Sequence, residues 1–270
     1  MREGKTYRLG RLFGPDGRAL ILPVDHGLTL GRIAGLEDPA ALLTELLPLG
    51  FDGVLMSPGL TRRTATLFAS RGAPSRVLTL DTFFRDAGET AAGSGLVGAV
   101  ADAARLGVDA VKLFMAWNVS SEERQATVSR IATVVAEAET YDLPVMVEPI
   151  VVDSPRSAAV SAVEGDAARV AGELGADIIK VGYPGPELMT AWVAELGVPL
   201  VILGGPRSGN PQDVLTLAAE AIGCGGRGIV IGRNVWQRER EVTRSLLRSL
   251  HGIAHGNAHG EAHGNAHGAT

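Results

Sequence analysis

The alternation of apolar strands with amphipathic helices is the feature that most constrains the fold of this chain. Eight runs rich in aliphatic and β-branched residues recur at intervals of a few tens of residues. They are residues 19–27, 51–59, 75–84, 109–117, 143–152, 177–185, 198–206 and 227–235. Segments with helical spacing separate them, and several end in Leu-Gly or Ile-Gly, which is a helix-stop signal. Continuous hydrophobic strands that alternate with helices predict a parallel sheet covered by helices.

Eight such units in about 230 residues predict a single-domain, closed (β/α)8 TIM barrel. We assign residues 19–250 to the barrel, residues 1–18 to an N-terminal segment and residues 251–270 to a tail. The alternative is a doubly wound open sheet, which should carry a glycine-rich fingerprint after its first strand. The first strand ends in PVDHG, without that fingerprint, and this favours the barrel.

Composition and charge exclude several classes of partner. The net charge is −5 and aromatic residues make up 4%, so the chain offers neither a basic field nor stacking surfaces for a nucleic acid. The N-terminus lacks the apolar stretch of a signal peptide, and no run is long enough to span a bilayer. We therefore expect a cytoplasmic protein that has no nucleic-acid or membrane partner.

Only three of the 25 basic residues are lysines, and two of these lie inside predicted strands. Lys180 stands within DIIKVGYPG, and Lys112 stands within DAVKLFMAW. Barrel active sites lie at the carboxyl ends of the strands, so we expect both ammonium groups there. Burial and a neighbouring cation favour the neutral amine of a lysine, which can attack a carbonyl to form an imine. The alternative for one such lysine is a structural role, either extending out of the barrel or paired with a carboxylate.

Asp25 and Glu148 are the carboxylates placed to move protons. Carbon–carbon bond cleavage through an imine needs one group to take the substrate hydroxyl proton, and another for protonation at carbon and dehydration of the carbinolamine. Each carboxylate could instead neutralise a lysine, and both interpretations can hold for a coupled pair. His26 could orient the substrate. It is the only histidine outside the tail, so it has no partner for a metal site of the histidine-cluster type, although carboxylates alone could hold Mg²⁺. We expect no catalytic metal and no cofactor.

Two glycine-rich turns follow the last two predicted strands, in LGGPRSG and IGRNVWQ. Turns of this kind lead into helix N-termini and present backbone amides to a phosphate in many barrel enzymes. Gly204, Gly205 and Gly232 lie in these turns, and Arg233 can add a charge-assisted contact. The pattern predicts a phosphate-binding site.

The C-terminal sequence HGIAHGNAHGEAHGNAHGAT carries five of the six histidines, one every four residues. It has almost no apolar content to bury, so we expect disorder. The alternative is a weak site for a divalent metal, formed by imidazoles that share one ion.

The segments VDHG, DAVKLF, VEPIV, DIIKVGYPG, LGGP and IGRNVWQ resemble those of the class I, Schiff-base aldolases of the DeoC, LacD and archaeal-type fructose-bisphosphate aldolase superfamily. The resemblance runs from about Ala19 to Gln237. It implies that Lys180 forms the imine, that Asp25 is an acid/base and that the glycine turns hold a substrate phosphate. Homo-oligomers are usual in the family, so an assembly is expected by resemblance.

The strand-five segment MVEPIV departs from one branch of that superfamily. The archaeal-type fructose-bisphosphate aldolases carry a tyrosine acid in a WSYPRG-like segment, and Glu148 stands in its place. A strand-five glutamate with a strand-four lysine is similar to the tagatose-bisphosphate aldolase branch, which implies catalytic roles for Lys112 and Glu148. DHG followed by GLEDP resembles the branch that joins phosphorylated sugars to aspartate semialdehyde.

These observations predict an aldolase that forms a Schiff base at Lys180 with a phosphorylated ketose or ketone, and that breaks or makes a carbon–carbon bond with an aldehyde. Two alternatives stay open. One is a phosphate-binding barrel isomerase or cyclase that uses the two carboxylates without an imine. The other is a non-catalytic barrel that binds a sugar phosphate or handles metal through its tail.

Overall fold

The computed structural model describes residues 3–83, 94–151 and 156–256. Eight of its strands form one closed barrel in the order β1-β10-β9-β8-β7-β6-β3-β2, and neighbouring strands in it are parallel. These strands are β1 (Ala19–Pro23), β2 (Gly53–Met56), β3 (Ser75–Thr79), β6 (Ala110–Ala116), β7 (Val145–Ile150), β8 (Ile178–Gly182), β9 (Leu200–Leu203) and β10 (Gly228–Val230). The predicted (β/α)8 TIM barrel is confirmed.

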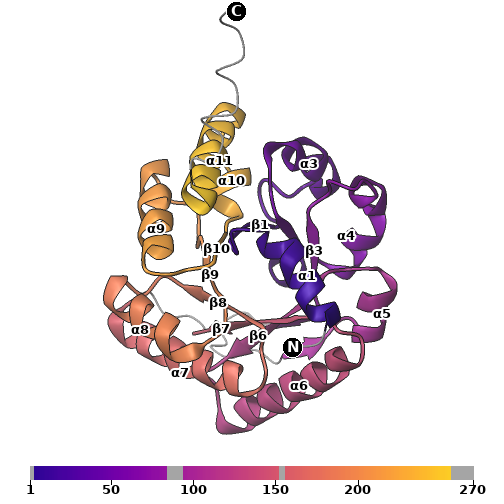
Figure 1. Cartoon of the computed structure of the whole chain (residues 1–270), viewed down its shortest axis with the longest axis vertical. Coiled ribbons are helices and arrows are strands. Elements are labelled where there is room, and N and C mark those ends of the chain that lie inside the picture. Colours follow the sequence, from indigo (N-terminus) through magenta and orange to yellow (C-terminus); the bar gives the residue numbers. More distant parts are fainter. Residues whose placement is uncertain (1–2, 84–93, 152–155, 257–270) are drawn as a thin grey trace, which may run out of the picture.

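Helices cover the outside of the barrel (Figure 1). They are α3 (Pro39–Leu46), α4 (Pro58–Arg63), α5 (Val100–Arg105), α6 (Ser121–Thr140), α7 (Ala158–Glu173), α8 (Pro186–Leu196), α9 (Pro211–Gly223) and α11 (Arg240–His255). Two short helices, α2 (Gly27–Leu30) and α10 (Arg233–Trp236), follow β1 and β10, and short 3-10 turns span Leu47–Leu49 and Ala65–Phe68. Ser120 begins α6 with a capping box, in which its side chain accepts from Glu123 N and the Glu123 side chain accepts from Ser120 N.

The third predicted strand, residues 75–84, divides into two strands. β3 ends at Thr79, and the next strand, β4 (Asp81–Phe83), leaves the barrel to pair antiparallel with β5 (Ser94–Leu96). The buried Asp81 carboxylate accepts a hydrogen bond from Phe114 N of β6 at 2.9 Å. A side chain therefore takes the β6 donor at the point where the chain leaves the barrel.

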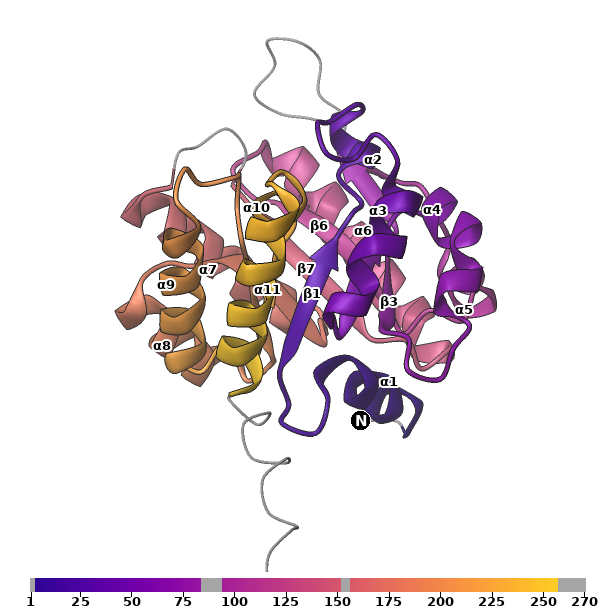
Figure 2. The same ribbon diagram turned by 90° about the horizontal axis from the view of Figure 1, so that it is seen from above.

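Helix α1 (Glu3–Phe13) closes the end of the barrel at which the strands begin, as Figure 2 shows for β1. Leu12 and Phe13 are buried among inward-facing residues of that end, such as Ile21, Leu55 and Met146. The sequence predicted no helix within residues 1–18, because the apolar face of α1 is only a few residues wide.

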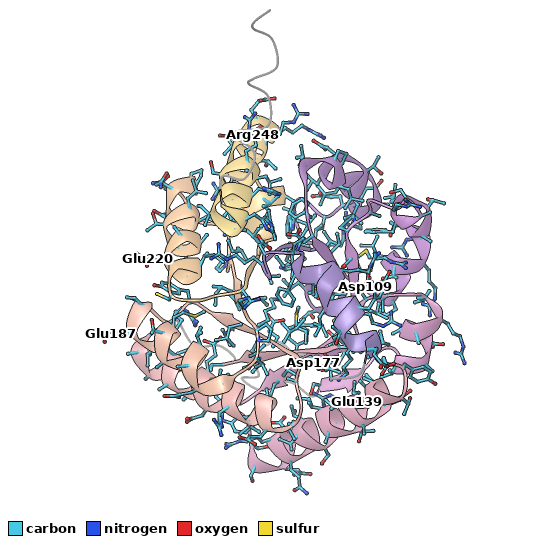
Figure 3. The ribbon with its side chains drawn as sticks, viewed as in Figure 1. Asp109, Glu139, Asp177, Glu187, Glu220 and Arg248 are labelled. Carbon is cyan, nitrogen blue, oxygen red and sulfur yellow. The ribbon has the colours of Figure 1, made fainter. Side chains whose placement is uncertain are left out.

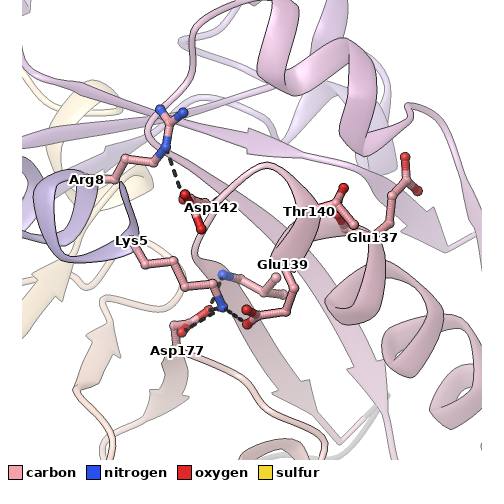
Figure 4. A network of polar contacts seen from close by, with 8 residues as sticks. Lys5, Arg8, Glu137, Glu139, Thr140, Asp142 and Asp177 are labelled. Carbon is pink, nitrogen blue, oxygen red and sulfur yellow. Dashed lines mark hydrogen bonds and ion pairs between the residues drawn. The ribbon is translucent and has the colours of Figure 1, made fainter. Parts of the chain in front are cut away.

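Lys5 fixes this helix to the barrel through buried ion pairs (Figure 4). Lys5 Nζ donates to Asp177 Oδ2 at 2.8 Å, and it also pairs with Glu139. Burial alone would lower the pKa of Lys5, but the hydrogen bonds to Asp177 and Glu139 outweigh it, and the pKa is raised. Arg11 of α1 adds a 2.8 Å pair with Asp109, and Asp109 and Asp177 both lie beside α1 in Figure 3. The third lysine of the chain is therefore structural.

Helix α11 extends into the segment that we assigned to the tail, because it continues to His255. His255 lies between Asp16 and Asp52, at 2.7 and 2.9 Å from their carboxylates. His251 also lies in α11, and residues 257–270, which hold the other three tail histidines, lie outside the described residues. In the part of the chain that the structure describes, no helix is both long and apolar enough to cross a membrane.

Candidate active site

Three predicted residues meet inside the barrel from three consecutive strands. Lys112 lies on β6, Glu148 on β7 and Lys180 on β8, and they are 0%, 6% and 7% exposed. Glu148 bridges the two lysines: Lys112 Nζ lies 2.7 Å from its Oε2, and Lys180 Nζ lies 2.9 Å from its Oε1. The Lys112 ammonium also lies over the ring of Phe114, 2.7 Å from the ring centroid. Two buried cations therefore share one carboxylate.

The electrostatics of this unit follow from burial and pairing. Burial would raise the pKa of Glu148, but the two lysines outweigh it and lower the pKa to about 2. Glu148 is thus ionised at neutral pH. Burial lowers the pKa of Lys112, although Glu148 and Asp25 oppose that shift. When both lysines are protonated, the group formed by Lys112, Glu148 and Lys180 carries one net positive charge. Loss of a single proton makes the group neutral, and burial favours the neutral form.

Asp25 lies two residues after the end of β1 and is 8% exposed. Its Oδ2 accepts a hydrogen bond from Thr79 Oγ1 at 2.7 Å. Thr79 is the last residue of β3 and stands beside Lys112 in the strand register. The hydroxyl therefore fixes the Asp25 carboxylate next to the layer of the two lysines, and sequence reasoning did not find it.

His26 precedes α2 and packs edge-on against Trp236, with ring centroids 5.3 Å apart. Burial lowers the pKa of His26, Asp25 opposes the shift, and Lys180 and Arg233 add to it. Nδ1 is buried and makes no hydrogen bond with the described residues. A neutral imidazole with an unused ring nitrogen beside Asp25 can bind a polar group of a substrate.

The two predicted glycine turns lie side by side at the carboxyl ends of β9 and β10. Gly205 has a φ of +66°, which favours glycine, and a Cβ on Gly204 would lie 3.0 Å from Ile231 Cγ1. A Cβ on Gly232 would lie 3.0 Å from Pro23 O, so only glycine lets this turn approach β1 so closely. Arg233 follows Gly232, and burial lowers the pKa of its guanidinium, whose Nε makes no hydrogen bond with the described residues. A buried donor of that kind suits an anion.

Asn234 and Arg238 join the two turns, a role that no local sequence pattern indicates. Asn234 Nδ2 donates to Gly204 O at 2.8 Å and to Pro206 O at 2.9 Å. Its Oδ1 accepts from Ser208 N at 2.8 Å, and Arg238 donates to both Ser208 O and Asn234 Oδ1 at 3.0 Å. The turn after β9 is thus held in one position relative to the turn after β10.

Comparisons with known proteins agree with this geometry. The model of the family described as "DeoC/LacD family aldolase" matches residues 19–238. The chain belongs to the DeoC/LacD aldolases. It is therefore a class I, Schiff-base type of carbon–carbon lyase, as the sequence predicted.

Relatives of this DeoC/LacD aldolase include two named synthases. The 2-amino-3,7-dideoxy-D-threo-hept-6-ulosonate synthase of Halobacterium salinarum is 33% identical over 87% of this chain and 86% of that one. The 2-amino-4,5-dihydroxy-6-oxo-7-(phosphonooxy)heptanoate synthase of Streptomyces griseus is 30% identical over 86% and 84%. A solved Schiff-base-forming fructose-1,6-bisphosphate aldolase is 29% identical, with a TM-score of 0.78 over 93% of this chain and 99% of that one.

Proposed function

We propose that this aldolase forms an imine between Lys180 and a three-carbon phosphorylated ketone of the dihydroxyacetone-phosphate type, and reversibly joins that ketone to an aldehyde. The observation that carries the proposal is the Glu148 carboxylate, bound on one oxygen by Lys180 and on the other by Lys112. The glycine turns with Arg233 supply a place for the phosphate.

Glu148 connects the two amines, so a proton can pass from Lys180 through the carboxylate to Lys112. Burial lowers the pKa of Lys112, so this group of three side chains can release one proton to solvent, and the proton that remains between the two amines can lie on Lys112 while the Lys180 amine is neutral. The neutral Lys180 amine attacks the ketone carbonyl. The carbinolamine loses water when its hydroxyl takes a proton back from the same unit, and an imine remains.

Asp25 handles the proton of the carbon–carbon step. In cleavage, the substrate hydroxyl gives its proton to Asp25, its oxygen becomes the aldehyde carbonyl, and the electrons of the broken bond move into the protonated imine to give an enamine. The enamine is then protonated at carbon, and water releases the ketone. His26 orients the oxygen that reacts with Asp25.

The names of the relatives supply candidates for the aldehyde. The Streptomyces griseus product carries adjacent hydroxyls, a ketone and a terminal phosphate, on a chain that begins with an amino acid. Breaking the bond between its two hydroxyl-bearing carbons gives a three-carbon keto phosphate and a four-carbon amino-acid aldehyde. We therefore propose an amino-acid semialdehyde as the first aldehyde to test, with glyceraldehyde 3-phosphate as the second because solved relatives are fructose-1,6-bisphosphate aldolases.

Borohydride trapping tests the imine directly. The protein is incubated with dihydroxyacetone phosphate, reduced, digested and analysed by mass spectrometry. A reduced adduct on Lys180 is expected, and Lys180→Arg, which keeps the charge beside Glu148 but cannot form an imine, should give none. Failure to trap dihydroxyacetone phosphate or any other phosphorylated ketone on Lys180 would overturn the proposal and favour an isomerase or cyclase that uses the carboxylates alone.

A further inference from the structure

The hydrogen-bonded pairing between β7 and β8 stops partway along the barrel. Its last register pair joins Val147 to Ile179. By contrast, β7 continues beside β6 as far as Ile150, and β8 continues beside β9 as far as Gly182. The ladder therefore has a gap at the carboxyl end, between the strand of the bridging glutamate and the strand of the imine-forming lysine.

A proline accounts for this gap. Ile150 O accepts from Trp117 N, so Ile150 directs its backbone groups toward the β6 side, whereas Val145 O accepts from Asp177 N on the β8 side. Alternate residues of a strand bond to opposite neighbours, so Pro149 faces β8, as Val145 does. Proline has no N–H and cannot donate to a ladder. The last residues of β8 thus lack a donor from β7 at this level.

Glu164 of α7 binds the end of β8 beyond this last register pair. It is 4% exposed, and its Oε1 accepts a hydrogen bond from Gly182 N at 2.8 Å. Arg156 donates to Glu164 Oε2 from both terminal nitrogens, at 2.8 and 2.7 Å, and from Nε to Tyr183 O at 3.2 Å. The ion pair thus binds the backbone of the residue that ends β8 and of the residue after it.

The space for this ion pair depends on Gly182. A Cβ built on Gly182 would overlap the Arg156 guanidinium. Gly182 lies two residues after Lys180, so the two share one face of the strand. The guanidinium therefore lies on the side of β8 that carries the reactive lysine, one step closer to the end of the strand.

We infer that Glu164, held by Arg156, is a positioning residue that accepts the Gly182 N–H where the β7 pairing has stopped and keeps the end of β8 aligned, so that Lys180 stays directed at Glu148. The inference rests on the proposed imine chemistry and adds a residue to it. Misplacement of a reacting group by about 1 Å can cost about 100-fold in rate, so a strand end held on one side only would be costly. If pairing with β9 sufficed to hold β8, Glu164 would have no effect on the chemistry.

The test measures the rate of borohydride-trappable imine formation at Lys180 with dihydroxyacetone phosphate, together with kcat and KM. We expect Glu164→Ala to slow imine formation by about 10- to 100-fold with little change in KM, because the phosphate turns are untouched. Glu164→Gln keeps an oxygen for Gly182 N and should restore the rate to within a few-fold of wild type. Glu173→Ala is the matched control, since Glu173 also lies on α7 and pairs with Arg169, but its side chain is 66% exposed.

Arg156→Met keeps the test decisive if Glu164→Ala does not fold, because the Arg156 side chain is 41% exposed and its loss leaves the core intact. Because this variant leaves the buried Glu164 carboxylate without its cation, we expect a lower thermal midpoint, and we expect trapping to slow by about threefold or more at a temperature at which the variant is folded. If Arg156→Met, or a folded Glu164→Ala, traps the imine at the wild-type rate, the role of Glu164 is overturned and the proposed function still stands. Absence of any adduct in the wild-type protein would instead overturn the proposed function.

Discussion

Lys180 Nζ lies 2.9 Å from Glu148 Oε1, in a layer of the barrel where both side chains are at least nine-tenths buried. The same carboxylate holds Lys112 on its other oxygen. A single glutamate therefore controls where the protons of two buried amines reside.

Glu148→Gln should lower kcat by about 100-fold or more, because the amide cannot pass a proton between the two lysines. It should also change the pH dependence of stability. The folded-state pKa of Glu148 is lowered to about 2 from 4.5, so its contribution to the free energy of unfolding is present above about pH 4.5 and is lost as pH falls toward 2. Urea unfolding between pH 2 and 5 should show a smaller loss of stability in the variant than in the wild type. Equal losses, or an unchanged kcat, would contradict this account.

Thr79 should affect the rate through Asp25 alone. Thr79→Val removes the hydroxyl that donates to Asp25 Oδ2, and we expect kcat to fall by about tenfold or more, the effect of losing a hydrogen bond to a charged group. KM for the phosphorylated ketone should stay constant, since the phosphate turns belong to β9 and β10. Thr79→Ser is the matched control because it retains the donor, and steady-state kinetics of both variants decide the matter. A Ser variant as slow as the Val variant would show that the methyl group, rather than the hydroxyl, is important.

Lys5 should matter for stability and not for chemistry. Lys5→Met leaves Asp177 and Glu139 without their cation at the end of the barrel remote from Lys180, and we expect a loss of about 2–4 kcal/mol in the free energy of unfolding. Urea unfolding measures this loss. At a temperature at which the variant is folded, the rate of imine trapping should equal that of the wild type. A variant with the wild-type free energy of unfolding that fails to trap the imine would contradict the structural role.

Two kinds of feature could be predicted from the sequence: elements that repeat along the chain, and charged residues that lie inside apolar strands. Apolar strands recur eight times, with helical segments between them of which several end in a helix-stop glycine, and this periodicity is enough for the barrel. Lys112, Glu148 and Lys180 are charged residues inside otherwise apolar strands, so they could be found one by one. Their convergence on one carboxylate follows from the barrel, because three consecutive strands direct them to the same interior layer.

Residues with an ordinary local signature could not be predicted. Threonine is common in strands, so Thr79 carried no sign that it binds Asp25. Glu164 resembles any polar residue of a surface helix, and its burial depends on a gap between two strands that no local pattern reveals. The split at Asp81 was also hidden, because LTLDTFF reads as one strand until the buried carboxylate takes the Phe114 N–H.

His255 should make the attachment of the last helix dependent on pH. Its ring lies between Asp16 and Asp52, and their hydrogen bonds, that of Asp52 foremost, raise its pKa to about 9 against the opposing effect of burial. A raised histidine pKa stabilises the folded state fully below the unfolded value near 6.5, and the contribution disappears as pH rises through 9. His255→Gln should therefore cost about 2 kcal/mol at pH 6 and much less at pH 10, measured by urea unfolding at each pH. Asp16→Asn should weaken the same pH dependence while leaving the histidine in place. A variant whose cost is the same at both pH values would show that the imidazole packs there uncharged.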